Sequence, residues 1–283
     1  MTFAEVTPPS TGAAVAPRDA RFLLALARRA ADAAAGVIRD AVPRRASLDW
    51  REKAAADFVT EVDVTAERKA IEVLLTAVPD AVFLAEETAT QVDLAALARG
   101  IAFVIDPLDG TTNFLHGLPD YAVSIAALVD GVLTAGVVQN VARNETFVAA
   151  VGAGAWLGDQ RLSVSPITDP MRALIGTGFP FRDPADIPAY LDQMARVMAG
   201  SAGVRRPGAA SIDLASVAAG RLDAFWENIL APWDVAAGIL LVREAGGVST
   251  DFDGAPSQAV RGPIAAGNPA IHEWLLRTLA ARA

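Results

Sequence analysis

Apolar side chains recur at helical spacing in two stretches of the amino-terminal third. Between residues 18 and 42, Phe22, Leu26 and Val37 are among the apolar positions near helical spacing, while arginines and aspartates mostly lie elsewhere. Residues 65–78 carry a second helical pattern, which stops before a proline. The pattern predicts two helices, the first of them amphipathic.

Two short apolar runs end in acidic residues. Residues 81–88 are typical of a short buried strand that leads into Glu86 and Glu87, and residues 101–105 are typical of a strand that delivers Asp106 to a loop. Both predicted strands therefore present carboxylates at one end.

Residues 121–164 consist of apolar segments separated by turn signals, of which Asp130-Gly131 and the glycines of residues 152–158 are the clearest. The run over residues 121–142 holds a single charge and is about as long as a membrane span. A helix that crosses a bilayer needs about 20 unbroken apolar residues, however, and the turn signal interrupts this run. The pattern predicts an antiparallel meander.

The second half alternates between strand-like and helix-like segments. The strand-like segments cover residues 173–181, 203–208, 223–229 and 247–254, and the helix-like ones cover residues 187–199, 211–220 and 233–247. We predict an α/β (α+β) fold with an antiparallel first sheet and a mixed second sheet. Residues 1–17 are expected to be a disordered arm, and residues 18–283 a single domain with subdomains at about 18–165 and 166–283.

Composition narrows the chemistry. The 283 residues are 53% hydrophobic and include no cysteine and only two histidines, His116 and His272. Disulfides, thiolate nucleophiles and zinc–thiolate sites are excluded, so a metal must be held mainly by oxygen atoms, which favours Mg²⁺. The net charge of −9 disfavours nucleic acid and anionic membranes as partners. The first 17 residues lack the pattern of a signal peptide, so we expect a cytoplasmic protein.

The segment over residues 106–113, with the sequence DPLDGTTN, is the most informative. Asp106 and Asp109 lie three positions apart, so both carboxylates and the Leu108 carbonyl could face one point and hold a hard cation. Gly110 permits close backbone approach, and a helix that starts directly after it would direct N–H groups toward a phosphate. Asp-Pro and Asp-Gly are also common turn dipeptides, so the segment alone leaves a plain turn open.

Other acidic positions have an ordinary structural explanation when each is taken alone. Glu86-Glu87 could be a solvated strand end, and Asp234 a helix N-cap. Thr60-x-x-Asp63 matches a loosely read capping box, and Asp57 could be a surface acid. Their occurrence together in one chain is what favours a shared site.

Four segments of the chain, taken in order, resemble the inositol monophosphatase family over about residues 18–254. They are DFVTEVD, the acidic pair after a strand, DPLDGTTNFLHG and PWDVAAG. The resemblance implies a layered α-β-α-β-α sandwich and a homodimer. It also implies phosphate ester hydrolysis that depends on two or three Mg²⁺ ions per site, with Mn²⁺ as a possible substitute, and that lithium inhibits.

The resemblance also implies roles for residues that match the family's motifs. The first metal would be held by Glu86, Asp106 and the Leu108 carbonyl, and the second by Asp106, Asp109 and Asp234. Catalysis would use Glu86, Asp63 and Thr111 to orient and polarise the attacking water, supported by Asp57 and Thr60. Phosphate would bind at Gly110, Thr111 and Thr112, and the rest of the substrate at Asp109, Ala210 and Glu227. A swap between Glu86 and Glu87 stays open, and Glu227 could instead be a solvated strand end.

The function that these features predict is hydrolysis of inositol monophosphate, or a similar polyol or sugar phosphate, by direct attack of metal-activated water. Related alternatives are fructose-1,6-bisphosphatase, histidinol-phosphatase, 3′(2′),5′-bisphosphate nucleotidase and a regulatory protein that retains the fold. We expect a small phosphate monoester as partner, and neither nucleic acid nor a membrane. Roles for Lys53, Arg205 and Arg206 stay open, His116 is expected to be a structural hydrogen-bonder, and His272 a surface residue.

Overall fold

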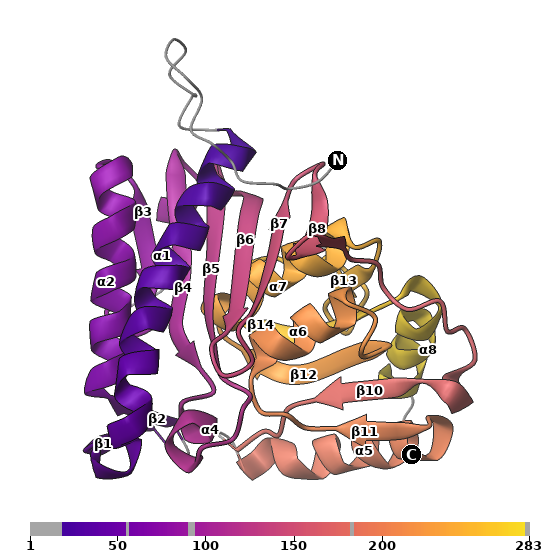
Figure 1. Ribbon diagram of the computed structural model, residues 1–283. Helices are drawn as coiled ribbons and strands as arrows, with labels where there is room; N and C mark the ends of the chain where they lie inside the picture. Colours follow the sequence, from indigo (N-terminus) through magenta and orange to yellow (C-terminus); the bar gives the residue numbers. More distant parts are fainter. Residues whose placement is uncertain (1–18, 55–56, 90–93, 182–183, 281–283) are drawn as a thin grey trace.

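Two large sheets and three layers of helices alternate through the described part of the molecule (Figure 1). The computed structural model describes residues 19–54, 57–89, 94–181 and 184–280, so the predicted arm over residues 1–17 lies outside the described part. The outer pair α1 (Ala20–Ala41) and α2 (Glu61–Ala77) shares a core with the first sheet. Helices α6 (Ala210–Ala218) and α7 (Pro232–Glu244) pack between the sheets, and α5 (Ile187–Gly200) and α8 (Pro269–Ala280) cover the second sheet. This arrangement confirms the α-β-α-β-α expectation.

The first sheet has seven strands within the described residues. Their order is β3 (Val82–Ala85), β4 (Ile101–Asp109), β5 (Ala122–Val129), β6 (Val132–Asn140), β7 (Glu145–Ala150), β8 (Gly154–Leu157) and β9 (Gln160–Arg161). The pairs from β4 to β9 are antiparallel, as the meander pattern predicts, with Asp130 and Gly131 at positive φ in the first turn. The pair β3·β4 is parallel, so both strands end at the same edge of the sheet. This edge is where the predicted acidic residues follow.

The second sheet is mixed. Within the described chain its order is β11 (Gly203–Arg205), β10 (Leu174–Thr177), β12 (Ala224–Leu230), β14 (Gly262–Gly267) and β13 (Val248–Thr250). Strand β10 is parallel to both of its neighbours, whereas β14 is antiparallel to both of its own. Strand β14 and helix α8 are absent from our sequence predictions. The two sheets fall on either side of residue 165, and the proposed subdomain boundary there stays a prediction.

Helix α2 begins earlier than residues 65–78 suggest. Thr60 caps it, since the hydroxyl accepts from the Val62 N–H at 3.0 Å while the Asp63 carboxylate accepts from the Thr60 N–H at 2.9 Å. The loosely read capping box is therefore real, and it lies next to the small hairpin of β1 (Trp50–Ala54) and β2 (Asp57–Thr60).

One alternative and one expectation about single residues were wrong. Asp234 is the third residue of α7 rather than its cap, and its carboxylate accepts from the Ala231 N–H at 2.7 Å. His272 is buried instead of lying on the surface, because α8 packs its ring against β13, where Nε2 lies 2.9 Å from the Thr250 hydroxyl. Burial lowers the pKa of His272.

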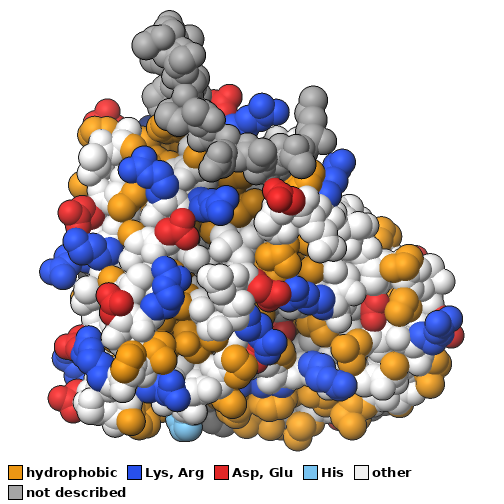
Figure 2. All heavy atoms as spheres, in the orientation of Figure 1, with side chains coloured by type: hydrophobic (Ala, Val, Ile, Leu, Met, Phe, Trp, Pro, Cys, Tyr) orange, Lys and Arg blue, Asp and Glu red, His pale blue; other side chains and the backbone are white. Residues whose placement is uncertain are grey.

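Burial explains the composition of the helices. Helix α7 is apolar on most sides because it packs between two sheets, whereas α1 buries one face and exposes its charges. Figure 2 shows side chains of both signs interspersed over the face that α1 and α2 cover. None of the helices in the described ranges is long and apolar enough to cross a membrane.

Candidate active site

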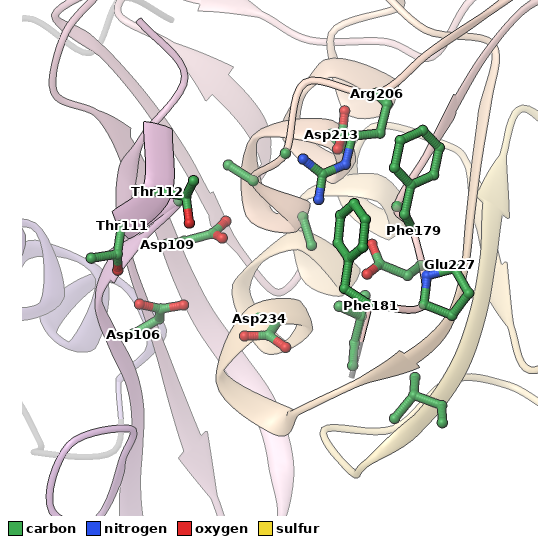
Figure 3. A pocket seen from close by; sticks show the side chains of 18 of the residues that line it. Asp106, Asp109, Thr111, Thr112, Phe179, Phe181, Arg206, Asp213, Glu227 and Asp234 are labelled. Atoms are coloured by element: carbon green, nitrogen blue, oxygen red, sulfur yellow. The ribbon is translucent and has the colours of Figure 1, made fainter. Parts of the chain in front are cut away.

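One cavity of about 450 Å³ collects the residues that the sequence motifs single out. It lies between the end of β4 and the first turns of α4 (Thr111–His116), α6 and α7. Ten predicted site residues line it: Glu86, Asp106, Leu108, Asp109, Gly110, Thr111, Thr112, Ala210, Glu227 and Asp234. Asp106 and Asp109 lie on one wall, Glu227 lies on the opposite wall, and Asp234 lies between them (Figure 3). Residues more than 100 positions apart in the chain therefore meet in one cavity.

The turn from β4 into α4 sets the geometry of the first wall. The pairing of β4 with β5 shifts register between Asp106 and Asp109, and the Leu108 N–H donates to the Asp106 carboxylate at 3.0 Å. Gly110 follows with φ +89°, and a side chain at this position would approach the Asp120 carbonyl oxygen at 2.8 Å. Only glycine suits both the left-handed conformation and this close approach.

Burial and like charge perturb the carboxyl groups of this wall. The pKa of Asp106 lies well above its usual range, first because the group is buried and then because Glu86, Asp109 and Asp234 add negative charge. Burial also raises the pKa of Asp109 to about 6, although hydrogen bonds from Ser211 oppose the shift. Its carboxylate accepts from the Ser211 N–H at 2.8 Å and from the hydroxyl at 2.5 Å.

The donor set fits a hard cation. Carboxylate and carbonyl oxygens are the ligands that Mg²⁺ prefers, and a cation would relieve the repulsion around Asp106. Among the described residues, no three histidine, aspartate or glutamate side chains form a ready-made metal cage. Glu86, Asp106, Asp109 and Asp234 line the same cavity, and the other three add negative charge around Asp106. Their side chains would have to rotate to coordinate a metal ion.

Asp63 lies behind the cavity and reaches it through Thr111. The Thr111 hydroxyl lies 2.9 Å from the Asp63 carboxylate and 3.1 Å from the Leu108 carbonyl oxygen. The other carboxylate oxygen of Asp63 accepts from the Thr60 hydroxyl at 2.5 Å. Burial raises the pKa of Asp63, and these hydrogen bonds oppose the increase. The predicted grouping of Asp63 with Thr111 is present.

The end of β3 separates the two neighbouring glutamates. Glu86 lines the cavity, whereas Glu87 is not among the lining residues. The Glu87 N–H donates to the buried carboxylate of Glu67 on α2 at 2.7 Å, which holds the strand end in place. The sequence analysis missed Glu67. A charged residue on the buried face of α2 was the signal that could have found it.

The opposite wall contains further residues to which the sequence analysis assigned no role. Arg206 lies over the rings of Phe179 and Phe181, with its central carbon 5.1 and 5.2 Å from the two ring centres. Asp213 lines the same wall and is 1% exposed. Burial raises its pKa well above the usual range, and the negative charges of Glu227 and Asp109 add to the shift.

The remaining candidates divide into three groups. The side chains of Asp57 and Lys53 lie outside the described part of the structure. Arg205 is exposed and is not among the cavity residues, in contrast to Arg206. His116 contacts the Thr112 carbonyl oxygen through Nδ1 at 2.9 Å, in agreement with a structural role.

Comparisons with known proteins agree with this picture. The family model for the inositol monophosphatase family matches residues 19–282. "Nus factor SuhB" of Pseudomonas aeruginosa is 45% identical over 259 residues, which cover 91% of this chain and 95% of that protein. "Inositol-1-monophosphatase" of Rhizobium meliloti is 45% identical over 223 residues, or 79% and 83% of the two chains. The crystal structure of the extragenic suppressor protein suhB from Bartonella henselae superposes with a TM-score of 0.85 at 39% identity, and the match covers 92% of this chain and 99% of that one. The chain therefore belongs to the inositol monophosphatase family.

Proposed function

We propose that this protein is a Mg²⁺-dependent phosphomonoesterase that hydrolyses inositol monophosphate or a similar polyol or sugar phosphate. One observation supports this function above the others. The acids Glu86, Asp106, Asp109 and Asp234 line one cavity, next to a hydrogen-bonded pair of Thr111 and Asp63. A cluster of carboxylates in one cavity repels a phosphate dianion, so it suits a phosphatase only as a holder of cations.

We assign the metal ligands as the resemblance implies. Glu86, Asp106 and the Leu108 carbonyl would hold one ion, and Asp106, Asp109 and Asp234 a second. Bound Mg²⁺ would neutralise charge on the phosphate oxygens and on the leaving group, and it would lower the pKa of water. Ser211 holds the Asp109 carboxylate from α6, which supports its orientation toward the cavity.

The chain's own groups would then position the reactants. The Thr111 hydroxyl has a single proton and two nearby acceptors, Asp63 and the Leu108 carbonyl, so a lone pair stays available to accept from a water molecule. That water would attack phosphorus while Glu86 takes its proton. A new P–O bond forms, the ester P–O bond breaks on the opposite side, and the departing alkoxide takes up a proton from water, which the proton held by Glu86 then replaces. The first N–H groups of α4, at Gly110 to Thr112, would hold the phosphate in line.

The alcohol part of the substrate would occupy the opposite wall. Glu227 and Ala210 line this part of the cavity, and a carboxylate there suits hydroxyl groups better than a second phosphate. The Glu227 charge favours inositol or another polyol, whereas Arg206 on the same wall would favour a second phosphate, as in fructose bisphosphate and bisphosphorylated nucleotides, whose enzymes use the same metal motif.

Phosphate release tests the proposal. We expect the purified protein to release phosphate from inositol 1-phosphate with Mg²⁺ and not with EDTA. A ranking of kcat/KM across inositol 1-phosphate, fructose 1,6-bisphosphate, histidinol phosphate and a bisphosphorylated nucleotide would identify the substrate class. Failure to release phosphate from any of the four with Mg²⁺ or Mn²⁺ would reject the enzyme proposal.

A regulatory role is the second candidate, and the names of relatives favour it. The Pseudomonas aeruginosa relative is named a Nus factor, whereas the Rhizobium meliloti relative carries an enzyme's name. Genetic complementation of a strain that lacks its own Nus factor SuhB would test the regulatory role. Complementation by Asp106→Asn as well as by wild type would show that such a role does not need the cavity chemistry.

We extend the proposal with several properties that the family resemblance implies. We propose a cytoplasmic homodimer that is sensitive to lithium and binds neither nucleic acid nor a membrane. Size-exclusion chromatography with light scattering tests the dimer, and inhibition by Li⁺ in the phosphate assay tests the lithium site. A shift of labelled RNA or DNA by the protein at physiological salt would contradict the expectation about nucleic acid.

A further inference from the structure

Asp213 is an acidic side chain on the cavity wall for which the proposed reaction has no use. It lines the cavity although only 1% of its surface is exposed, and its Oδ1 has no hydrogen-bond partner among the described residues. Leaving a buried polar atom without a partner is costly. This oxygen is enclosed next to Gly176 of β10, and a rotation of the carboxyl group would turn it toward the cavity, where a ligand can supply the partner.

The first turn of α6 holds Asp213 at a fixed place relative to the metal-binding wall. Ala209, Ala210 and Asp213 share one face of the helix, because residues three and four positions apart lie above one another, and all three line the cavity. The same turn is attached to the opposite wall by the hydrogen bonds from Ser211 to Asp109. Asp213 therefore faces the space that the alcohol part of a bound phosphate ester would occupy.

The surrounding charges select the chemistry of the partner. Glu227 and Asp109 bring negative charge toward Asp213, which disfavours a second phosphate or a carboxylate. Arg206 brings positive charge from the same wall, which disfavours an ammonium group. A hydroxyl is neutral and can either donate or accept a hydrogen bond, so it suits this position whether or not the carboxyl carries a proton.

We propose that Asp213 is a specificity-determining residue whose carboxyl group hydrogen-bonds a hydroxyl group on the alcohol part of the substrate. The protein would thereby select polyol phosphates over esters that lack hydroxyl groups. This assignment rests on the proposed phosphatase function and names a further contact within the same cavity. The contact lies one helical turn beyond Ala210, on the side of Glu227.

A matched pair of substrates tests the assignment. Inositol 1-phosphate and cyclohexyl phosphate share a six-membered ring, and only the first carries free hydroxyl groups. For Asp213→Ala we expect the ratio of kcat/KM for inositol 1-phosphate over cyclohexyl phosphate to fall by about 3- to 100-fold, the range for one lost hydrogen bond to a neutral or a charged carboxyl group. The rate with cyclohexyl phosphate should stay within about twofold of wild type. Asp213→Asn keeps the volume and one acceptor, so it should lower the ratio less and covers the case in which the alanine variant does not fold.

Three results separate the alternatives. An unchanged ratio in both Asp213 variants, or an equal loss with both substrates, would overturn the role of Asp213 and leave the phosphatase proposal intact. No hydrolysis of either ester by wild type would overturn both proposals. Asp186→Asn is the control, since Asp186 also lines the cavity but is only half-buried. An equal drop in the ratio for this variant would mean that any cavity charge suffices, and the assignment would be wrong.

Discussion

The α-carbon of Gly178 lies so close to the Glu227 carboxylate that a methyl group at position 178 would overlap with it. Gly178 follows β10, and Glu227 lies in the middle of β12, the neighbouring strand. The backbone of Gly178 is not in the left-handed region, so alanine meets no backbone strain there. Glycine at this position thus leaves room for one side chain of the proposed substrate site.

We therefore expect Gly178→Ala to displace Glu227 without removing its charge. The value of kcat/KM for inositol 1-phosphate should fall by about tenfold, the loss of one hydrogen bond to a charged group, while that for cyclohexyl phosphate should change little. Gly262→Ala is the matched control, because a side chain at that position of β14 would meet no atom within 4 Å. Equal effects of the two variants would argue against a role for Gly178.

Asp106→Asn should lower the activity by at least about 100-fold, because a carboxylate that we propose as a ligand of both metal ions would be lost. Asparagine also removes a buried charge that Glu86, Asp109 and Asp234 repel, so the melting temperature in EDTA should not fall. Added Mg²⁺ should raise the melting temperature of wild type more than that of the variant. A variant that keeps most of the wild-type rate would refute the assignment of Asp106.

Magnesium binding should weaken at acidic pH through Asp109. Its pKa is raised to about 6, so below that pH a proton competes with the cation for the carboxylate, and the apparent dissociation constant should rise by up to roughly tenfold per pH unit. Ser211→Ala removes the hydroxyl hydrogen bond that favours the charged form and keeps the one from the backbone N–H, so the weakening should begin at higher pH. Calorimetric titration with Mg²⁺ at several pH values measures both effects. An affinity that does not change with pH would contradict the role of Asp109 as a ligand.

Thr111→Val should lower kcat by about 100-fold while the fold persists, because valine has nearly the same shape and lacks the hydroxyl that contacts Asp63. Thr134→Val is the matched control, since the Thr134 hydroxyl donates only to the nearby Val132 carbonyl in β6, according to the described contacts. A kcat within twofold of wild type for Thr111→Val would remove the hydroxyl from the mechanism.

His272 should make the protein less stable at acidic pH. Burial lowers its pKa below the ordinary value of 6.5, so the unfolded chain takes up a proton that the folded protein refuses. This contribution is absent above about pH 6.5 and reduces the free energy of unfolding as the pH falls further. Urea denaturation at about pH 7.5 and about pH 5.5 should show a smaller loss for His272→Gln than for wild type. The same loss in both proteins would exclude His272 as the cause.

The residues near Asp106 in the sequence were sufficient to predict the strand, turn and helix around it. Apolar residues of β4 precede two acids three positions apart, and Gly110 then permits the left-handed turn into α4. These features depend on near neighbours in the chain, so periodicity and turn chemistry reveal them. The antiparallel meander is predictable for the same reason, because each of its strands pairs with the next one along the chain.

Contacts between distant segments were beyond this kind of reasoning. Nothing near Asp109 in the chain indicates that Ser211, 102 positions later, would hold its carboxylate. Glu67 contacts the end of β3 only because α2 packs there, and Asp213 lines the cavity only because of the position of α6. Gly178 lies beside Glu227 only because β10 pairs with β12. His272 was misplaced on the surface because burial on α8 depends on how the helix packs against the second sheet.

The linear order of residues therefore sufficed for the fold class, the acidic motifs and the turn that brings Asp106 and Asp109 together, since backbone preferences and side-chain periodicity act over a few residues. The packing of the sheets and of α6 and α7 was needed to bring both walls of the cavity together, to bury Asp213 and to leave space beside Gly178. Those properties arise from burial and close contact between segments far apart in the chain, so they cannot be predicted from a residue's neighbours in the sequence.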